Sequence, residues 1–155
     1  MKHVWMVGYD FSQHSSALVR IAAGELQPQS GKLVLLHVYQ VPPTPLSFNS
    51  MHIETSYLHQ TELSKSIEEE ASKGLEKVLK TLQAEFPSLE IVFLVKAGDP
   101  SKVILEKVEQ LGVDRLIIGS HSRTGIEHFF LGSVAEKIVK HSTVSVLVVK
   151  HRDDS

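Results

Sequence analysis

The chain has 155 residues, which is long enough for one domain with a sizeable hydrophobic core. Its hydrophobic fraction of 42% and charged fraction of 22% are typical of a folded globular protein and exclude an intrinsically disordered one. A formal net charge of −2 at pH 7 excludes a general positive field for nucleic acid, and the absence of cysteine excludes disulfides, thiolate metal sites and a cysteine nucleophile.

The apolar runs of the sequence are all short. The N-terminal sequence MKHVWMVGYDF has too short an apolar run for a signal peptide, and no stretch approaches the roughly 20 apolar residues of a membrane helix. We therefore expect a cytosolic protein, folded as a single domain over residues 1–155, with neither nucleic acid nor a membrane among its partners.

The first half of the chain predicts two strands, one helix and an irregular segment. Residues 4–7 and 33–38 (LVLLHV) are short apolar runs without alternation, as expected for strands of a parallel sheet covered on both faces. Between them, apolar residues from Ala17 to Leu26 follow a helical period. Residues 40–56 then form a Pro-rich polar segment, which we expect to be a long mobile loop, either a surface insertion or a lid over a ligand.

The next helix and strand follow this loop. An amphipathic stripe from Leu63 to Phe86 predicts a long helix, and residues 91–95 (IVFLV) predict the third strand. Asp99-Pro100 predicts the start of another helix. The Asp side chain can cap such a helix, and a proline at the first position lacks an N–H that would have no partner.

Two more strands and one helix complete the pattern. Gly112 closes the third helix, residues 116–118 (LII) and 144–149 (VSVLVV) predict the last two strands, and residues 133–140 predict the helix between them. Strands that alternate strictly with helices indicate an α/β fold. We expect a doubly wound, five-stranded parallel sheet in the order 3-2-1-4-5, Rossmann-like, with helices on both faces and right-handed crossovers.

In such a sheet a ligand binds at the carboxyl ends of the strands, where the strand order reverses. Here that place lies between strands one and four. Gly8, Tyr9 and Asp10 follow strand one, and residues 119–122 follow strand four. Gly119 allows the backbone to turn sharply and to approach a ligand closely. Tyr9 either stacks on a base or fills the place of one.

The last predicted helix opens with Gly132-Ser133. A helix N-terminus presents unpaired N–H groups and about half a positive charge, which suits a phosphate. Ser133 adds a hydroxyl donor, and Arg123 can supply a balancing cation. Equally, Gly119 and Gly132 can be ordinary turn glycines and Ser133 only the start of a helix, and the residues alone leave both interpretations open.

A longer pattern resembles the universal stress protein family. The family's nucleotide signature is Gly-x-x-Gly, nine residues, then Gly-Ser or Gly-Thr, and this chain has GSHS at residues 119–122, nine residues, then Gly132-Ser133. The similarity also covers Asp10 after the first strand, the runs KAGDPSKVILE and GVDRLIIGSHSRTG, and the final VSVLVVK. Ser122 stands where the signature has its second glycine.

The resemblance implies a protein that binds an adenine nucleotide, ATP or AMP with Mg²⁺ as a companion ion, in stress response or signalling. It implies contact of Asp10 with the nucleoside, of Val41 with the adenine, and of the loop after strand four with ribose and phosphates. The predicted nucleotide site comprises Gly8, Tyr9, Asp10, Val41, Ile118, Gly119, Ser122, Arg123, Gly132, Ser133 and Val134.

The family also implies a homodimer in which the last strands pair antiparallel. The sequence favours this independently, because residues 144–149, from Val144 to Val149, form a long apolar strand at the sheet edge, which needs cover or a partner. The alternative function is a nucleotide-free dimeric interaction module of the same family, which Ser122 and Tyr9 favour.

Catalytic alternatives have weaker patterns. Neither Ser120 nor Ser122 has glycines two residues away on both sides, as the G-x-S-x-G elbow of a serine hydrolase requires. The chain has neither a Walker P-loop nor a G-x-G-x-x-G after the first strand. We therefore expect no catalytic residue and at most very slow ATP hydrolysis.

The sequence contains nine histidines. His52 and His59 lie seven residues apart, as do His121 and His128, and neither pair has the H-x-x-x-H spacing of a helical metal site. We expect no metal site, and we expect His37 in the second strand to be a hydrogen-bonded core residue.

Overall fold

The computed structural model describes residues 2–43, 50–120 and 131–150, with the backbone alone at residues 50–56. Its strands form one five-stranded parallel sheet in the order β3-β2-β1-β4-β5, which confirms the predicted fold class. The strands are β1 (Val4–Gly8), β2 (Lys32–Tyr39), β3 (Glu90–Ala97), β4 (Arg115–Gly119) and β5 (Ser145–Val149). The helices are α1 (Gln13–Leu26), the short 3₁₀ helix η1 (Gln27–Gln29), α2 (Ser50–Glu85), α3 (Pro100–Gln110) and α4 (Ser133–His141).

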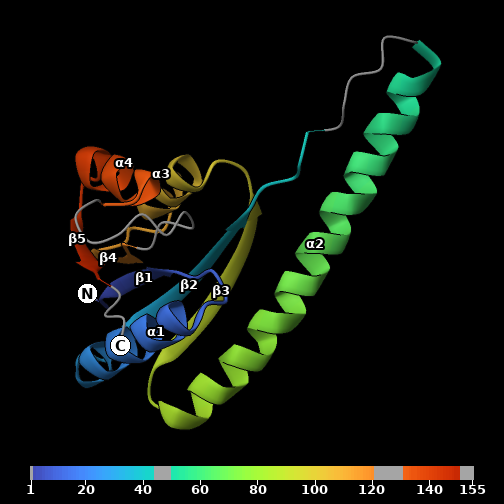
Figure 1. Ribbon diagram of the computed structural model, residues 1–155. Helices are drawn as coiled ribbons and strands as arrows, with labels where there is room; N and C mark the ends of the chain where they lie inside the picture. Colours follow the sequence, from blue (N-terminus) through green and yellow to red (C-terminus); the bar gives the residue numbers. More distant parts are fainter. Residues whose placement is uncertain (1, 44–49, 121–130, 151–155) are drawn as a thin grey trace, which may run out of the picture.

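Helices cover both faces of the sheet (Figure 1). On one face α1 and α2 bury a cluster that includes Val7, Leu35 and Leu75. On the other face α3 and α4 bury a cluster that includes Met6 and Ile138. Because the neighbours Met6 and Val7 point to opposite, equally buried faces, the sequence of β1 is apolar without alternation.

Side-chain caps fix where α1 and α3 begin. Oδ1 of Asp99 accepts hydrogen bonds from the Ser101 hydroxyl at 2.6 Å and from the Lys102 N–H at 3.0 Å, which confirms the predicted start of α3. The hydrogen bond from the Ser101 hydroxyl, and to a smaller extent the one from the Lys102 N–H, holds the pKa of the Asp99 carboxyl below its ordinary value. The cap of α1 is Ser12, whose Oγ accepts from the Ser15 N–H at 3.0 Å.

Two turns around α3 depend on glycine. Gly112 closes the helix with a φ angle of 59°, as predicted. Gly98 connects β3 to α3 with a φ angle of 139°, and its N–H donates to the carbonyl oxygen of Tyr39 at 2.9 Å. Residues with a Cβ avoid both conformations, so these glycines set the path of the chain at either end of α3.

Helix α2 is longer than the sequence indicated. It begins at Ser50, so residues 50–56 belong to the helix and the prediction that residues 40–56 form a loop is wrong for that part. Between Pro45 and Gly74 the sequence contains neither proline nor glycine, so no residue there breaks a helical backbone. Residues 44–49 of the expected loop lie outside the described residues.

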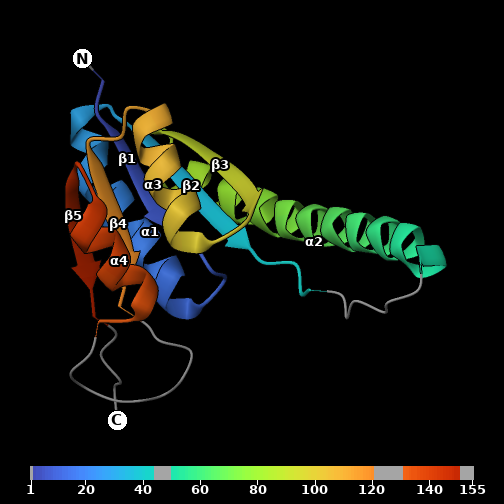
Figure 2. The ribbon, with the colours of Figure 1, turned by 90° about the horizontal axis from the view of Figure 1, so that it is seen from above.

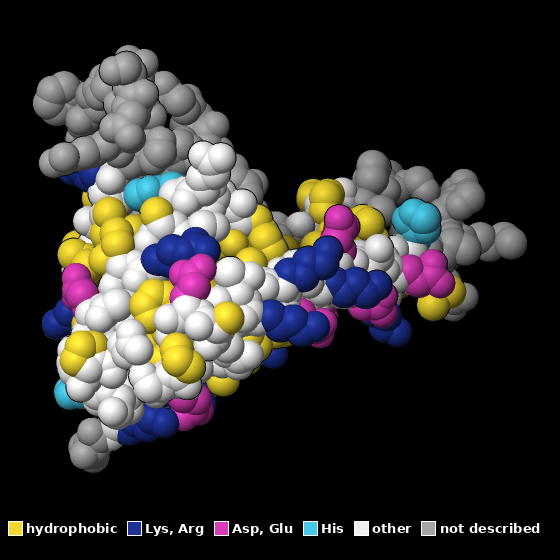
Figure 3. Space-filling model, turned by 90° about the horizontal axis from the view of Figure 1, so that it is seen from below, with side chains coloured by type: hydrophobic (Ala, Val, Ile, Leu, Met, Phe, Trp, Pro, Cys, Tyr) yellow, Lys and Arg dark blue, Asp and Glu magenta, His cyan; other side chains and the backbone are white. Residues whose placement is uncertain are grey.

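The N-terminal part of α2 projects beyond the edge of the sheet (Figures 1 and 2). The helix has 36 residues, which corresponds to about 54 Å of length. Its C-terminal part packs on the sheet through Ala71, Leu75 and Leu82. Basic and acidic side chains lie along the projecting arm (Figure 3). Neither α2 nor any other helix in the described part of the chain is long and apolar enough to cross a membrane.

Candidate functional site

A cavity of about 1240 Å³ opens at the carboxyl ends of β1, β2, β3 and β4, beside the N-terminus of α4. It lies where the strand order reverses between β1 and β4. Every predicted site residue that the structure describes lines this cavity: Gly8, Tyr9, Asp10, Val41, Ile118, Gly119, Gly132, Ser133 and Val134. The other two, Ser122 and Arg123, lie outside the described residues.

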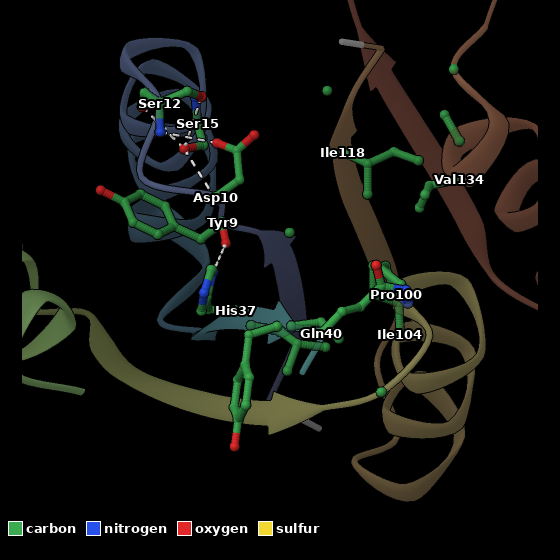
Figure 4. Close-up of a pocket in the computed structure, with 18 of the residues that line it drawn as sticks. Tyr9, Asp10, Ser12, Ser15, His37, Gln40, Pro100, Ile104, Ile118 and Val134 are labelled. Carbon is green, nitrogen blue, oxygen red and sulfur yellow. Dashed lines mark hydrogen bonds between the residues drawn. The ribbon is translucent and has the colours of Figure 1, made fainter. Parts of the chain in front are cut away.

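The loop between β1 and α1 places Asp10 at the cavity wall (Figure 4). Oδ1 of Asp10 accepts a hydrogen bond from the Ser12 N–H at 3.0 Å, and the Asp10 N–H donates to Oγ of Ser15 at 3.4 Å. Since Ser12 caps α1 and Ser15 belongs to its first turn, the carboxylate lies at the positive end of that helix. Asp10 is therefore an exposed acceptor held in a defined position.

The ring of Tyr9 does not occupy the cavity. It is 5% exposed, its hydroxyl forms a hydrogen bond of 3.2 Å with the Ser16 hydroxyl, and it points away from the cavity (Figure 4). The Tyr9 carbonyl accepts a hydrogen bond of 2.8 Å from Nδ1 of His37, so the predicted hydrogen bond of this histidine is confirmed. The prediction that His37 is a core residue is wrong, because it is only partly buried and lines the cavity. Tyr9 therefore neither fills the place of a base nor offers its ring for stacking.

Gly119 packs against His14, a role that the sequence did not suggest. Its φ angle is not positive, unlike the φ angles of Gly98 and Gly112, so no sharp turn requires glycine at this place. A Cβ on Gly119 would lie 2.9 Å from Cδ2 of His14, so glycine makes room for that ring. Nε2 of His14 in turn donates to the carbonyl oxygen of Val149 at 3.1 Å.

The N-terminus of α4 forms another wall. Gly132 is its N-cap, with φ −55° and ψ 152°, and no described side chain caps this helix. Residues 132–135 all line the cavity. The first N–H groups of a helix have no partner within the helix, so together with the helix dipole they give this wall a positive partial charge.

A third part of the lining is apolar. Val41 follows β2, Pro100 and Ile104 belong to α3, and Ile118 belongs to β4. Pro100, Ile104 and Ile118 lie across the cavity from Asp10 (Figure 4). The cavity thus combines a carboxylate, a positive helix end and apolar surface, a combination of few polar groups and apolar lining that is typical of small-molecule sites.

Comparison with known proteins identifies the family. The model of the universal stress protein family matches residues 1–150 of the chain. The chain belongs to the universal stress protein family. This confirms the resemblance that the signature around Gly119 and Gly132 indicated.

A similar relative of this universal stress protein is the universal stress protein MJ0577 of Methanocaldococcus jannaschii. The two sequences are 35% identical over 94 residues, which are 61% of this chain and 57% of the relative. By sequence, the chain therefore matches less than two thirds of that relative's length. The solved structure of hypothetical protein MJ0577 has a TM-score of 0.81 and 27% identity, and the match covers 99% of both chains.

Two further similar structures hold nucleotides. A universal stress protein in complex with cAMP has a TM-score of 0.58 and 18% identity, with 96% of this chain and 97% of that chain covered. A universal stress protein family protein from Arabidopsis thaliana with AMP bound has a TM-score of 0.59 and 20% identity, with 99% and 94% covered. At these identities the likeness shows a shared fold, and the nucleotides are ligands of those two proteins.

His14 is a cavity residue that the sequence did not indicate. It lies two residues after the Ser12 cap, on the side of α1 that also buries Ser15 and Leu18. That position, four residues before a buried leucine, could have placed His14 toward the sheet and the strand ends.

Metal ligands do not gather in the described residues. Residues 2–43, 57–120 and 131–150 contain no group of three or more His, Asp or Glu side chains that could hold a metal ion. His121 and His128 lie outside the described residues, as does the side chain of His52.

Proposed function

We propose that this universal stress protein binds an adenine nucleotide, ATP or AMP, in the cavity between β1 and β4. The observation that carries the proposal is the convergence of Asp10, the first turn of α4 and an apolar wall that includes Ile118 in one cavity. A nucleotide has three matching parts: ribose hydroxyls that donate to a carboxylate, phosphates that suit a helix N-terminus, and a flat apolar base. The cAMP and AMP complexes of two proteins with the same fold support the choice of adenine.

Each part of the nucleotide has its own wall in this proposal. Asp10 accepts hydrogen bonds from the ribose, and Val41 contacts the adenine. The proposed phosphate site consists of residues from the end of β4 to the start of α4: Gly119, Ser122, Arg123, Gly132 and Ser133. Mg²⁺ enters with the triphosphate. The cavity of about 1240 Å³ is larger than the roughly 300–1,000 Å³ of ordinary ligand pockets, so its size supports ATP as well as AMP.

The proposed role is binding, with at most very slow hydrolysis of ATP, in stress response or signalling in the cytosol. The Asp10 carboxylate supports binding, because its hydrogen bond from the Ser12 N–H holds it in position as an acceptor for hydroxyl groups. A hydroxyl donor of the ribose fits that acceptor without any proton transfer.

We also propose a homodimer through β5, with residues 144–149 of two copies paired antiparallel. β5 is an edge strand that pairs with β4 on one side. Leu147 of β5 is 38% exposed and Val139 of the adjacent α4 is 48% exposed. An apolar edge strand of this kind gains hydrogen bonds and apolar cover from a second copy.

Isothermal titration calorimetry with AMP, ATP and ATP plus Mg²⁺ tests the nucleotide proposal, with GTP as the control for the base. We expect heat of binding from the adenine nucleotides and weaker binding of GTP. Acid extraction of the purified protein, followed by chromatography, checks for nucleotide that is carried from the cell. No heat with millimolar ATP and Mg²⁺, together with an empty extract, leaves the nucleotide-free interaction module as the function.

A further inference from the structure

Phe11 has a backbone conformation that bulky residues avoid. Its φ angle is 64°, in the left-handed region, although it follows Asp10 directly in the loop between β1 and α1. In that region Cβ crowds a carbonyl oxygen, so the conformation persists only where the surrounding structure imposes it. The residue is 42% exposed, so burial alone does not account for this conformation.

Two aromatic rings hold the Phe11 ring edge-on. The ring centroids of Phe11 and Tyr9 lie 5.1 Å apart, and those of Phe11 and His37 lie 4.9 Å apart. The interplanar angles of 74° and 71° are those of T-shaped contacts, which are favourable for aromatic pairs. Both partners are themselves joined, because Nδ1 of His37 donates to the Tyr9 carbonyl.

The third contact of the Phe11 ring is with helix α2 at Gly74. A Cβ on Gly74 would lie 2.7 Å from Cε1 of Phe11, closer than side-chain atoms can approach. A glycine in a helix interior is less favourable than alanine. The space beside Gly74, which we call the Gly74 notch, therefore has a physical reason: it admits the Phe11 ring.

The turn around Phe11 determines where the Asp10 carboxylate lies. The hydrogen bond from the Ser12 N–H to Oδ1 of Asp10 spans Phe11, so the φ and ψ angles of Phe11 set whether it can form. We propose that Phe11 is a positioning residue that, seated in the Gly74 notch, fixes the Asp10 carboxylate at the cavity wall. The consequence for nucleotide affinity rests on the proposed function, whereas the effect on the turn does not.

Gly74→Ala tests this proposal, because its methyl group closes the notch. Gly24→Ala is the matched control, since Gly24 is also inside a helix and a Cβ there has no neighbour within 4 Å. The first readout is amide hydrogen exchange by NMR at Ser12, compared with Lys102, whose N–H donates to Oδ1 of Asp99 at the same distance of 3.0 Å.

In Gly74→Ala we expect the Ser12 amide to exchange about fivefold faster, the effect of losing one hydrogen bond, and the Lys102 amide to exchange as before. Gly24→Ala changes neither amide. Phe11→Leu, which keeps a Cβ but loses the ring and its T-shaped contacts with Tyr9 and His37, should also speed exchange at Ser12. Should Gly74→Ala fail to fold, Phe11→Gly removes the ring while accepting the same φ angle, and faster exchange at Ser12 is again expected.

Calorimetry with AMP provides the second readout, with a dissociation constant that rises about fivefold in Gly74→Ala and stays unchanged in Gly24→Ala. If the wild-type protein binds no nucleotide, the proposed function fails. The exchange rate of the Ser12 amide then still tests whether Phe11 positions Asp10. Unchanged Ser12 exchange in a folded Gly74→Ala protein overturns the proposal. Equal acceleration at Ser12 and Lys102 also overturns it, because general destabilisation then explains the effect.

Discussion

His14 donates a hydrogen bond of 3.1 Å from Nε2 to the carbonyl oxygen of Val149, at the end of β5. The same ring fills the space that Gly119 leaves at the end of β4. One side chain of α1 thus contacts the ends of two strands at the cavity. The His14 ring therefore fits at this place because Gly119 has no side chain.

A double-mutant cycle on His14 and Gly119 tests this arrangement. His14→Ala loses the bond to Val149 and should lower the free energy of unfolding by about 1–2 kcal/mol. Gly119→Ala alone should cost a similar amount, because its Cβ would lie 2.9 Å from the His14 ring. In the double variant the added methyl group occupies vacated space, so the cost should be clearly below the sum. Additive costs in urea unfolding would contradict the arrangement.

Two other glycines should respond to the same substitution in opposite directions. A Cβ on Gly31 would lie 2.8 Å from the carbonyl oxygen of His3, a backbone atom that cannot move aside, so Gly31→Ala should cost about 1–3 kcal/mol. Gly24, inside α1, has open space around it, so Gly24→Ala should stabilise the protein by about 0.5–1 kcal/mol. Calorimetric melting temperatures of both variants check the two signs, and a fall for Gly24→Ala would contradict the open space at this position.

Much of the fold could be predicted because it depends on local patterns. The strands are buried on both faces, so each is a short apolar run, and strict alternation with helices then leaves few topologies. The crevice follows from the strand order, which is why the strand-end residues Gly8, Asp10 and Gly119 could be assigned to one site from their positions in the sequence. The cap at Asp99 could be predicted for the same reason, since its partners are two and three residues away.

The remaining features depend on contacts between residues far apart in the sequence, and a single sequence does not show which distant residues are in contact. Gly119 looks like a turn glycine until His14, more than a hundred residues earlier, is placed against it. Gly74 looks like a weak point of a helix until the Phe11 ring lies beside it. The start of α2 at Ser50 could not be predicted, because the prolines before it indicate a loop without indicating where that loop ends.

The cap of α3 gives the protein a pH-dependent contribution to stability. Because the pKa of Asp99 is lowered in the folded state, its contribution is present above the unfolded value of 3.8 and is lost as the pH falls through the lower folded value. Asp99→Ala should lower the free energy of unfolding by about 1 kcal/mol at pH 7. The difference in free energy of unfolding between Asp99→Ala and the wild type, measured by urea unfolding, should be smaller near pH 3. Asp99→Asn, a neutral cap, should show a smaller loss at pH 7, and an Asp99→Ala difference that does not change with pH would contradict the assignment.

The proposed dimer depends on the exposed edge of β5. Leu147→Lys places a charge on that edge and should convert the dimer to a monomer, measured as mass by light scattering after gel filtration. Leu111→Lys is the control, because Leu111 at the end of α3 is 39% exposed, close to the 38% of Leu147, and does not belong to β5. A monomeric wild-type protein would contradict the proposed dimer. A dimer that persists in Leu147→Lys would place the interface elsewhere.

Gly132 offers the sharpest test of the proposed phosphate site, because charge can be changed there with little change in shape. Asp and Asn are both favourable N-cap residues, so Gly132→Asp and Gly132→Asn should both fold with α4 intact. The carboxylate of Gly132→Asp would repel the phosphates, and two like charges about 4 Å apart near a protein surface repel by roughly 4 kcal/mol. We therefore expect ATP to bind at least about tenfold more weakly to Gly132→Asp than to Gly132→Asn, measured by calorimetry. Equal affinity in the two variants contradicts the assignment, because bulk and not charge would then govern what binds at the start of α4.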